Sequence, residues 1–177
     1  IKLAEKLYTY PDVAARLREM RRLVESSRSS LIFTNTRPMS EILGSRFKLW
    51  EISLPIKVHH GSLSAESRVR AEKELKSGKL KALICTSSLE LGLDIGSIDL
   101  VIQYNSPRQA TRLVQRVGRS GHRLGLTSRG VVIVQSPDDA LEALVIARRA
   151  LSEELEPVRI PEKPMDALMH EVVAMLL

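Results

Sequence analysis

Short apolar runs alternate along the chain with longer stretches in which apolar residues recur at helical spacing. The apolar runs are bounded by turn-forming residues and predict buried strands at residues 31–33, 56–59, 81–86, 100–104 and 130–135. Helices are predicted at residues 11–24, 38–50, 64–77, 110–117 and 137–151. Continuous apolar strands that alternate with helices are typical of a mostly parallel sheet covered by helices on both faces. The pattern therefore predicts an α/β fold, with residues 1–151 as one domain.

The pattern changes after residue 151. Residues 152–164 are charged and contain three prolines, which predicts a linker. From Met165 an apolar helical pattern resumes, and residues 165–177 are predicted to begin a following domain. The chain starts at Ile1 rather than at a methionine and ends inside this apolar pattern. We therefore expect both ends to belong to a longer protein.

Composition narrows the class of protein. The 177 residues are 44% hydrophobic, which is enough for one domain with a sizeable core and too little for two large ones. No apolar run reaches the roughly 20 residues of a membrane-spanning helix. Cys85, the only cysteine, has no disulfide partner within the chain, which fits a reducing compartment. We therefore expect a cytoplasmic protein without a membrane partner. A net charge of +6 favours a polyanionic partner.

Arginines are concentrated in one part of the chain. No acidic residue lies between Asp99 and Asp138, and the same interval carries Arg108, Arg112, Arg116, Arg119, Arg123 and Arg129. On a helix, residues 112, 116 and 119 fall on one side, opposite Leu113 and Val117. This spacing predicts that the guanidinium groups face outward. A planar, permanently charged guanidinium suits phosphate, so the helix predicts contact with a polyanion.

Polar residues follow three of the predicted strands. Parallel strands place their carboxyl ends at one edge of the sheet, where open α/β sheets bind ligands. Hydroxyls, backbone N–H groups and arginines at that edge suit phosphate groups. The predicted contacts are Thr34, Asn35, Thr36, Arg37, Gly61, Ser62, Arg68, Thr86 and Ser87. His59 and His60 alternate across the pleat and show no zinc-ligand spacing, so we predict no metal site.

Four of these stretches occur in the order of known helicase motifs. The segment Gln115-Arg116-Val117-Gly118-Arg119-Ser120-Gly121 resembles motif VI of superfamily 2 helicases. Residues 31–37 resemble motif IV, residues 86–96 resemble motif V, and residues 58–64 resemble the element that grips one strand's phosphates. The chain is most similar to the large helicase-related family. The resemblance implies the second, C-terminal RecA-like lobe, a mostly parallel sheet flanked by helices.

The resemblance also implies roles for individual residues, and it assigns the predicted phosphate contacts to the backbone of a nucleic acid. Arg119 would be an arginine finger on the ATP γ-phosphate, a group typically worth about 10³- to 10⁵-fold in rate. Asp94, in the turn bounded by Gly92, would accept hydrogen bonds from the ribose hydroxyls. Gln115 would approach the phosphates or couple the two lobes. The remaining residues implied in catalysis are Arg116 and either His122 or Arg123, one of which replaces the third arginine of the motif.

The nucleotide itself is expected to be bound mainly elsewhere. Ser77-Gly78-Lys79 lacks the upstream glycine and the following hydroxyl of a phosphate-binding loop, and no Mg²⁺-binding Asp-Glu motif is present. ATP with Mg²⁺ would therefore be held by an N-terminal RecA-like lobe of the same protein, and residues 1–177 alone would be inactive. The resemblance further implies DNA rather than RNA, a role in DNA repair, and a winged-helix domain after residue 164.

Two other interpretations use the same residues. A nucleic-acid-binding module without ATPase activity could use the same arginine face. A small-molecule α/β enzyme could use it to bind a phosphate-bearing substrate. If the chain is a binding module, changing Arg119 removes nucleic-acid binding, and there is no ATPase activity to be lost. If the chain is a small-molecule enzyme, it binds a phosphate-bearing ligand other than a nucleotide selectively.

Overall fold

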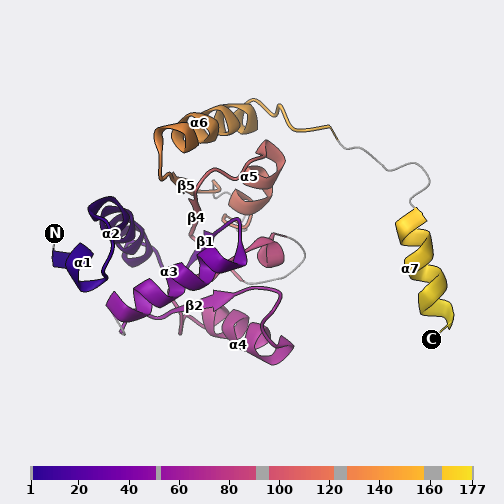
Figure 1. The fold of residues 1–177 in the computed structure, drawn as a ribbon, viewed down its shortest axis with the longest axis horizontal. Coiled ribbons are helices and arrows are strands. Elements are labelled where there is room, and N and C mark those ends of the chain that lie inside the picture. The colour runs from indigo at the N-terminus through magenta and orange to yellow at the C-terminus, as the bar shows by residue number, and fades with distance from the viewer. Residues whose placement is uncertain (1, 51–52, 91–95, 122–126, 158–164, 177) are drawn as a thin grey trace.

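The computed structural model describes residues 2–50, 53–90, 96–121, 127–157 and 165–176. Within them the chain forms one parallel sheet of five strands in the order β2-β3-β1-β4-β5 (Figure 1). The strands are β1 (Ser30–Phe33), β2 (Ile56–His59), β3 (Ala82–Cys85), β4 (Leu100–Tyr104) and β5 (Gly130–Ile133). Each predicted strand is present, and the predicted parallel α/β sheet is confirmed.

The helices follow the predicted pattern. Those that were predicted are α2 (Pro11–Glu25), α3 (Arg37–Trp50), α4 (Ala65–Lys76), α5 (Ala110–Val117), α6 (Pro137–Leu151) and α7 (Met165–Leu176). The sequence did not predict the short helix α1 (Lys2–Lys6) or the 3₁₀ turn η1 (Ser87–Leu89). The Ser64 hydroxyl accepts a hydrogen bond from the backbone N–H of Ser67, which satisfies one of the free donors at the start of α4.

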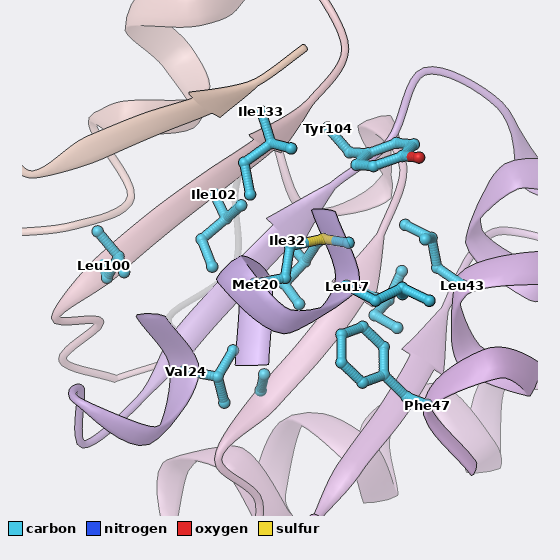
Figure 2. Packing of buried hydrophobic residues seen from close by; sticks show 12 residues of the cluster. Leu17, Met20, Val24, Ile32, Leu43, Phe47, Leu100, Ile102, Tyr104 and Ile133 are labelled. Atoms are coloured by element: carbon cyan, nitrogen blue, oxygen red, sulfur yellow. The ribbon is translucent and has the colours of Figure 1, made fainter. Parts of the chain in front are cut away.

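The core lies on both faces of the sheet because alternate strand residues point to opposite sides. Helices α2 and α3 cover one face, where Leu17 and Phe47 pack against strand residues such as Ile32 and Ile102 (Figure 2). Helix α4 and the turn η1 cover the other face, where their apolar residues meet Leu83 and the neighbouring positions of β1 and β4. Helix α5 packs between this face and α6. Two covered faces explain why the strands carry almost continuous apolar runs.

The first residues after α6 remain in contact with the domain, because the Glu156 carboxylate accepts hydrogen bonds from Ala110 and Thr111. The backbone N–H of Glu154 donates to the Arg149 carbonyl, and Glu153 adopts a left-handed conformation with φ of 58°. The beginning of the predicted linker is therefore held against the lobe. Farther along, apolar side chains of α7 such as Met169 and Met175 are exposed. Among the described helices, none combines the length and the apolar character that crossing a membrane requires.

Candidate functional site

The polar residues that follow β1, β2 and β3 lie at one edge of the sheet. Phe33 and His59 both pair with Cys85, so the three strands end level with one another. The residues just past these strands include Thr36, Arg37, Gly61, Ser62 and Ser87, all of which are exposed, while Thr86 is half-buried. The structure therefore brings the predicted backbone contacts together at the carboxyl edge.

Thr34 and Asn35, two residues of this set, form hydrogen bonds within the lobe. Thr34 is buried, and its hydroxyl donates to the carbonyl of Thr36 at 3.0 Å. The amide of Asn35 donates to the Ser106 carbonyl at 2.7 Å, and its oxygen accepts from Arg116 at 3.0 Å. These contacts fix the shape of the edge, whose surface is formed by their exposed neighbours.

Arg68 contributes a guanidinium group near this edge. It lies in the second turn of α4, and its side chain is half-buried. Its Nε is buried and has no hydrogen-bond partner among the described residues. Arg70, two residues later, is instead paired with Glu66 at 2.6 Å. The guanidinium charge of Arg68 is therefore not neutralised in the way that Glu66 neutralises Arg70.

The two adjacent histidines point to opposite sides, as the pleat of the strand predicts. His59 contacts the Ser88 hydroxyl at 3.0 Å and the Glu72 carboxylate of α4 at 2.8 Å. His60 contacts the Glu41 carboxylate of α3 at 2.5 Å. The described residues contain no group of histidine, cysteine, aspartate or glutamate side chains that could hold a metal ion. The contacts of His59 join β2, η1 and α4 behind the carboxyl edge.

Arg116 corrects the prediction of an outward guanidinium face. Its side chain is buried, with only 1% of the residue exposed. Its Nε and Nη2 donate to the Glu90 carboxylate at 2.8 and 2.5 Å. Its Nη1 donates to the Gln103 oxygen at 2.6 Å, and the guanidinium lies 5.2 Å from the centre of the Phe33 ring. Arg116 therefore joins α5 to β1, β4 and the end of η1.

The prediction from helical spacing was wrong for Arg116, because spacing alone does not show where buried hydrogen-bond acceptors lie in the fold. A buried charge is tolerated when it is paired and its hydrogen bonds are satisfied. Burial lowers the pKa of Arg116, and the hydrogen bonds to Glu90 act in the opposite direction. Arg112 remains 36% exposed at its side chain and lies 3.8 Å from the same carboxylate.

Arg119 lies at the other end of the strands. The next residue, Ser120, forms a parallel bridge with Ile98, which precedes the start of β4. The Gly121 N–H donates to the Ile98 carbonyl at 3.2 Å, and Ser97 accepts from Ser29, the residue before β1. Arg119 is half-buried, and its buried Nε has no hydrogen-bond partner among the described residues. The predicted residues thus form two groups, one at each edge of the sheet.

Several predicted positions cannot be placed in these groups. Gly92, Asp94, His122 and Arg123 lie outside the described residues. Gln115 is exposed on α5. The predicted proximity of Asp94 to Arg119 therefore stays a prediction. Asp94 precedes Ser97 by only three residues in the sequence.

Glu156 is a functional candidate that the sequence did not indicate. Its carboxylate accepts hydrogen bonds from the backbone N–H groups of Ala110 and Thr111 and from the Thr111 hydroxyl, at 2.8, 2.8 and 2.6 Å. These groups begin α5, whose own N-cap residue, Gln109, forms no side-chain cap. The hydrogen bonds, above all the one from the Thr111 hydroxyl, lower the pKa of Glu156 to about 2. No local pattern links positions 46 residues apart, so only the fold reveals this cap.

Replacing Arg116 by alanine should destabilise the fold strongly. The change leaves the Glu90 carboxylate buried without its partner, so we expect a loss of about 3–5 kcal/mol in the free energy of unfolding. The matched control, Arg112→Ala, removes a more exposed and more distant partner and should cost about 1 kcal/mol or less. Urea unfolding of the two variants measures the difference, and equal losses would contradict the buried network.

Glu156→Gln should change how stability depends on pH. Because the folded-state pKa of about 2 lies below the ordinary value of 4.5, the carboxylate stabilises the fold fully above that ordinary value. This stabilisation is lost as the pH falls toward 2. The gap in unfolding free energy between wild type and Glu156→Gln should therefore narrow in acid. Urea unfolding over this range tests it, with Glu154→Gln as the control. A gap that stays constant with pH would count against the capping role.

Comparison with known proteins supports a common origin for this arrangement. Residues 13–124 match the family described as helicase conserved C-terminal domain. The ATP-dependent helicase Lhr-Core protein 2 of Thermococcus barophilus is 41% identical over 157 residues, which are 88% of this chain and 18% of that protein. Lhr-Core of Methanothermobacter thermautotrophicus is 43% identical over 157 residues, covering 86% of this chain and 18% of that protein.

A solved structure agrees in fold as well as sequence. The structure of Mycobacterium smegmatis helicase Lhr bound to ssDNA and AMP-PNP aligns with a TM-score of 0.82 and 39% identity. The alignment covers 89% of this chain and 21% of that one, so the chain spans only about a fifth of the length of this relative. The chain therefore belongs to the helicase conserved C-terminal domain family, as a RecA-like lobe of the large helicase-related type.

Proposed function

We propose that this domain is the second motor lobe of an ATP-dependent DNA helicase, with Arg119 as the arginine finger. The observation that carries the proposal is that the buried Nε of Arg119 has no hydrogen-bond partner in the part of the chain that the structure describes. A buried donor without a partner costs about 1–3 kcal/mol. A γ-phosphate held by the neighbouring lobe would supply the missing acceptor. A guanidinium preorganised in a partly desolvated site stabilises developing phosphate charge effectively.

The nucleotide site would be completed by residues near Arg119. Asp94 would accept from the ribose hydroxyls, with Gly92 permitting the turn, and Gln115 would approach the phosphates. His122 or Arg123 would supply a further charge. ATP and Mg²⁺ would be held mainly by the first lobe, so residues 1–177 alone would not hydrolyse ATP. The relative solved with AMP-PNP, an ATP analogue, supports this assignment of the ligand.

The carboxyl edge would hold the backbone of one nucleic-acid strand. Its exposed hydroxyls, the backbone at Gly61 and the guanidiniums of Arg37 and Arg68 are suited to phosphate oxygens. Thr34 and Asn35 would act by shaping this surface. The same relative was solved with ssDNA, which supports DNA as the strand. The two lobes would close when ATP binds and reopen after hydrolysis. This cycle would shift the contacts of the carboxyl edge from one set of backbone phosphates to the next.

The chain after the lobe would enter a further domain. Helix α7 presents exposed apolar side chains, including Met165, Leu168 and Val173. An apolar helix of this kind needs a partner that buries it. We assign α7 to the start of a winged-helix domain and residues 152–164 to the linker that precedes it.

Arg119→Ala in the full-length helicase should abolish most ATP hydrolysis and leave strand binding largely intact. The expected loss in kcat is about 10³- to 10⁵-fold, because the finger acts on the transition state. Arg148→Ala, which removes an exposed arginine of α6, is the matched control and should behave as wild type. Steady-state ATPase rates and strand-binding titrations measure the two effects. Lost binding in a protein without measurable ATPase would favour the non-catalytic binding module instead.

Arg68→Ala should weaken strand binding to a similar extent for every sequence tested. A phosphate contact carries no sequence information, and its loss should reduce the slope of log K against log salt by about 1. Arg70→Ala is the control, because Arg70 is exposed and already paired with Glu66. Titrations of oligonucleotides of different sequence at several salt concentrations test this. A loss confined to one sequence, or a slope equal to that of wild type, would remove Arg68 from the strand-binding edge.

A further inference from the structure

The beginning of α5 is held by Glu156. This residue lies in the exit segment, which we define as residues 152–157 after α6. The three hydrogen bonds to Glu156 satisfy two backbone donors and one hydroxyl in the first turn of α5. Free donors at a helix start are normally satisfied by the residue just before the helix. Gln109 does not serve this role here. The cap is therefore supplied by the exit segment, outside the sequence of the helix itself.

The exit segment fixes the position of Glu156. Helix α6 ends at Leu151, and Glu153, whose N–H donates to the Ala150 carbonyl, follows in a left-handed conformation. The Glu154 N–H donates to the Arg149 carbonyl at 2.9 Å, and the Arg149 guanidinium lies 3.9 Å from the Glu156 carboxylate. Glu156 is consequently held between the end of α6 and the start of α5.

Helix α5 is short enough that its ends determine its orientation. It has 8 residues, about two turns, and a helix of that length is marginal without tertiary contacts. Three constraints hold it: the Glu156 cap at its start, the packing of Leu113 near Ile146, and the buried Arg116 network. Arg119 follows directly after the C-cap residue, Gly118. A shift of the helix start therefore changes the placement of the residues at its end.

We propose that Glu156 is a positioning residue for Arg119, and that through it the exit segment sets the orientation of the arginine helix. This inference rests on the proposed arginine-finger role of Arg119. Glu156 does not touch the nucleotide in this scheme. It acts by holding the first turn of α5 so that the end of the helix presents Arg119 in one orientation.

Glu156→Gln in the full-length helicase tests the proposal. Glutamine keeps the size of the side chain but loses the charge that strengthens the three hydrogen bonds. We expect kcat for ATP hydrolysis to fall by about 10- to 100-fold, the scale associated with a small misplacement of a catalytic group. The KM for ATP should change by less than about twofold, because a group acting only in the transition state affects kcat.

The matched control is Glu154→Gln. Glu154 is exposed in the same segment, and its side chain forms no hydrogen bond or ion pair with the described residues. It should retain wild-type kcat and KM. If Glu156 merely stabilises the fold, Glu156→Gln will lower Tm and leave kcat unchanged well below Tm. That result would overturn the proposal.

A second pair of variants shows whether the effect passes through Arg119. Arg119→Lys keeps the positive charge but loses the forked guanidinium. Adding Glu156→Gln to Arg119→Lys should lower kcat by less than about twofold. The lysine no longer makes the guanidinium contact, so a change in the position of residue 119 has little further effect on the rate. An equal fold-loss in both backgrounds would show that Glu156 acts independently of Arg119 and would overturn the proposal. Failure of the arginine-finger role itself is distinguishable, since Arg119→Ala would then retain wild-type kcat.

Thr111 provides a conservative check on the same contact. Thr111→Ser keeps the hydroxyl that donates to Glu156 and should retain wild-type kcat. Thr111→Val keeps the shape but removes the donor and should lower kcat in the same direction as Glu156→Gln, by a smaller factor. Wild-type kcat in both Thr111→Val and Glu156→Gln would show that the capping contact does not position Arg119.

Discussion

The buried ion pair between Arg116 and Glu90 is the constraint on which the rest of the site depends. Its guanidinium donates to three different side chains, which come from the ends of β1 and β4 and from the end of η1. Burying a charge is costly, and the cost is offset only when the geometry satisfies its donors. Together with the Glu156 cap at the start of α5, the pair therefore restricts how this helix lies against the sheet. The shape of the surfaces at both edges depends on this arrangement of α5.

The parallel sheet explains why the site has two separate parts. All carboxyl ends lie at one edge, which gathers the polar residues that follow β1, β2 and β3. Helix α5 starts beyond β4 and runs back along the sheet, so the residues after it meet Ile98 near the other edge. In the proposed function, one end of the strands serves the nucleic-acid backbone and the other end serves the nucleotide. The Arg116 side chain binds residues near the carboxyl edge, so the helix that leads to Arg119 is anchored at that edge.

Much of this fold is predictable from local sequence, and the reasons for the exceptions are physical. The strands and main helices follow from apolar periodicity, as Leu100–Tyr104 and Pro137–Leu151 illustrate. The candidate residues at strand ends follow from topology alone. Periodicity failed at Arg116 because it assigns a charged residue to solvent without regard to buried acceptors. Gln103, a polar residue inside an apolar strand, was the available signal for that acceptor. Glu156 had no such signal, because its partners are remote in sequence.

The contrast between Arg116 and Arg119 shows why the motif must be interpreted by position. Both carry the same guanidinium, three residues apart on one short segment. For Arg116 the fold supplies acceptors on every side, so its donors are used within the lobe. A lysine ammonium, with compact geometry, could not span those partners. For Arg119 the buried Nε has no acceptor in the described part of the lobe. The donors of Arg116 are used within the lobe, whereas the Nε of Arg119 has no acceptor among the described residues, and this difference supports the proposal that Arg119 is the residue that serves a ligand.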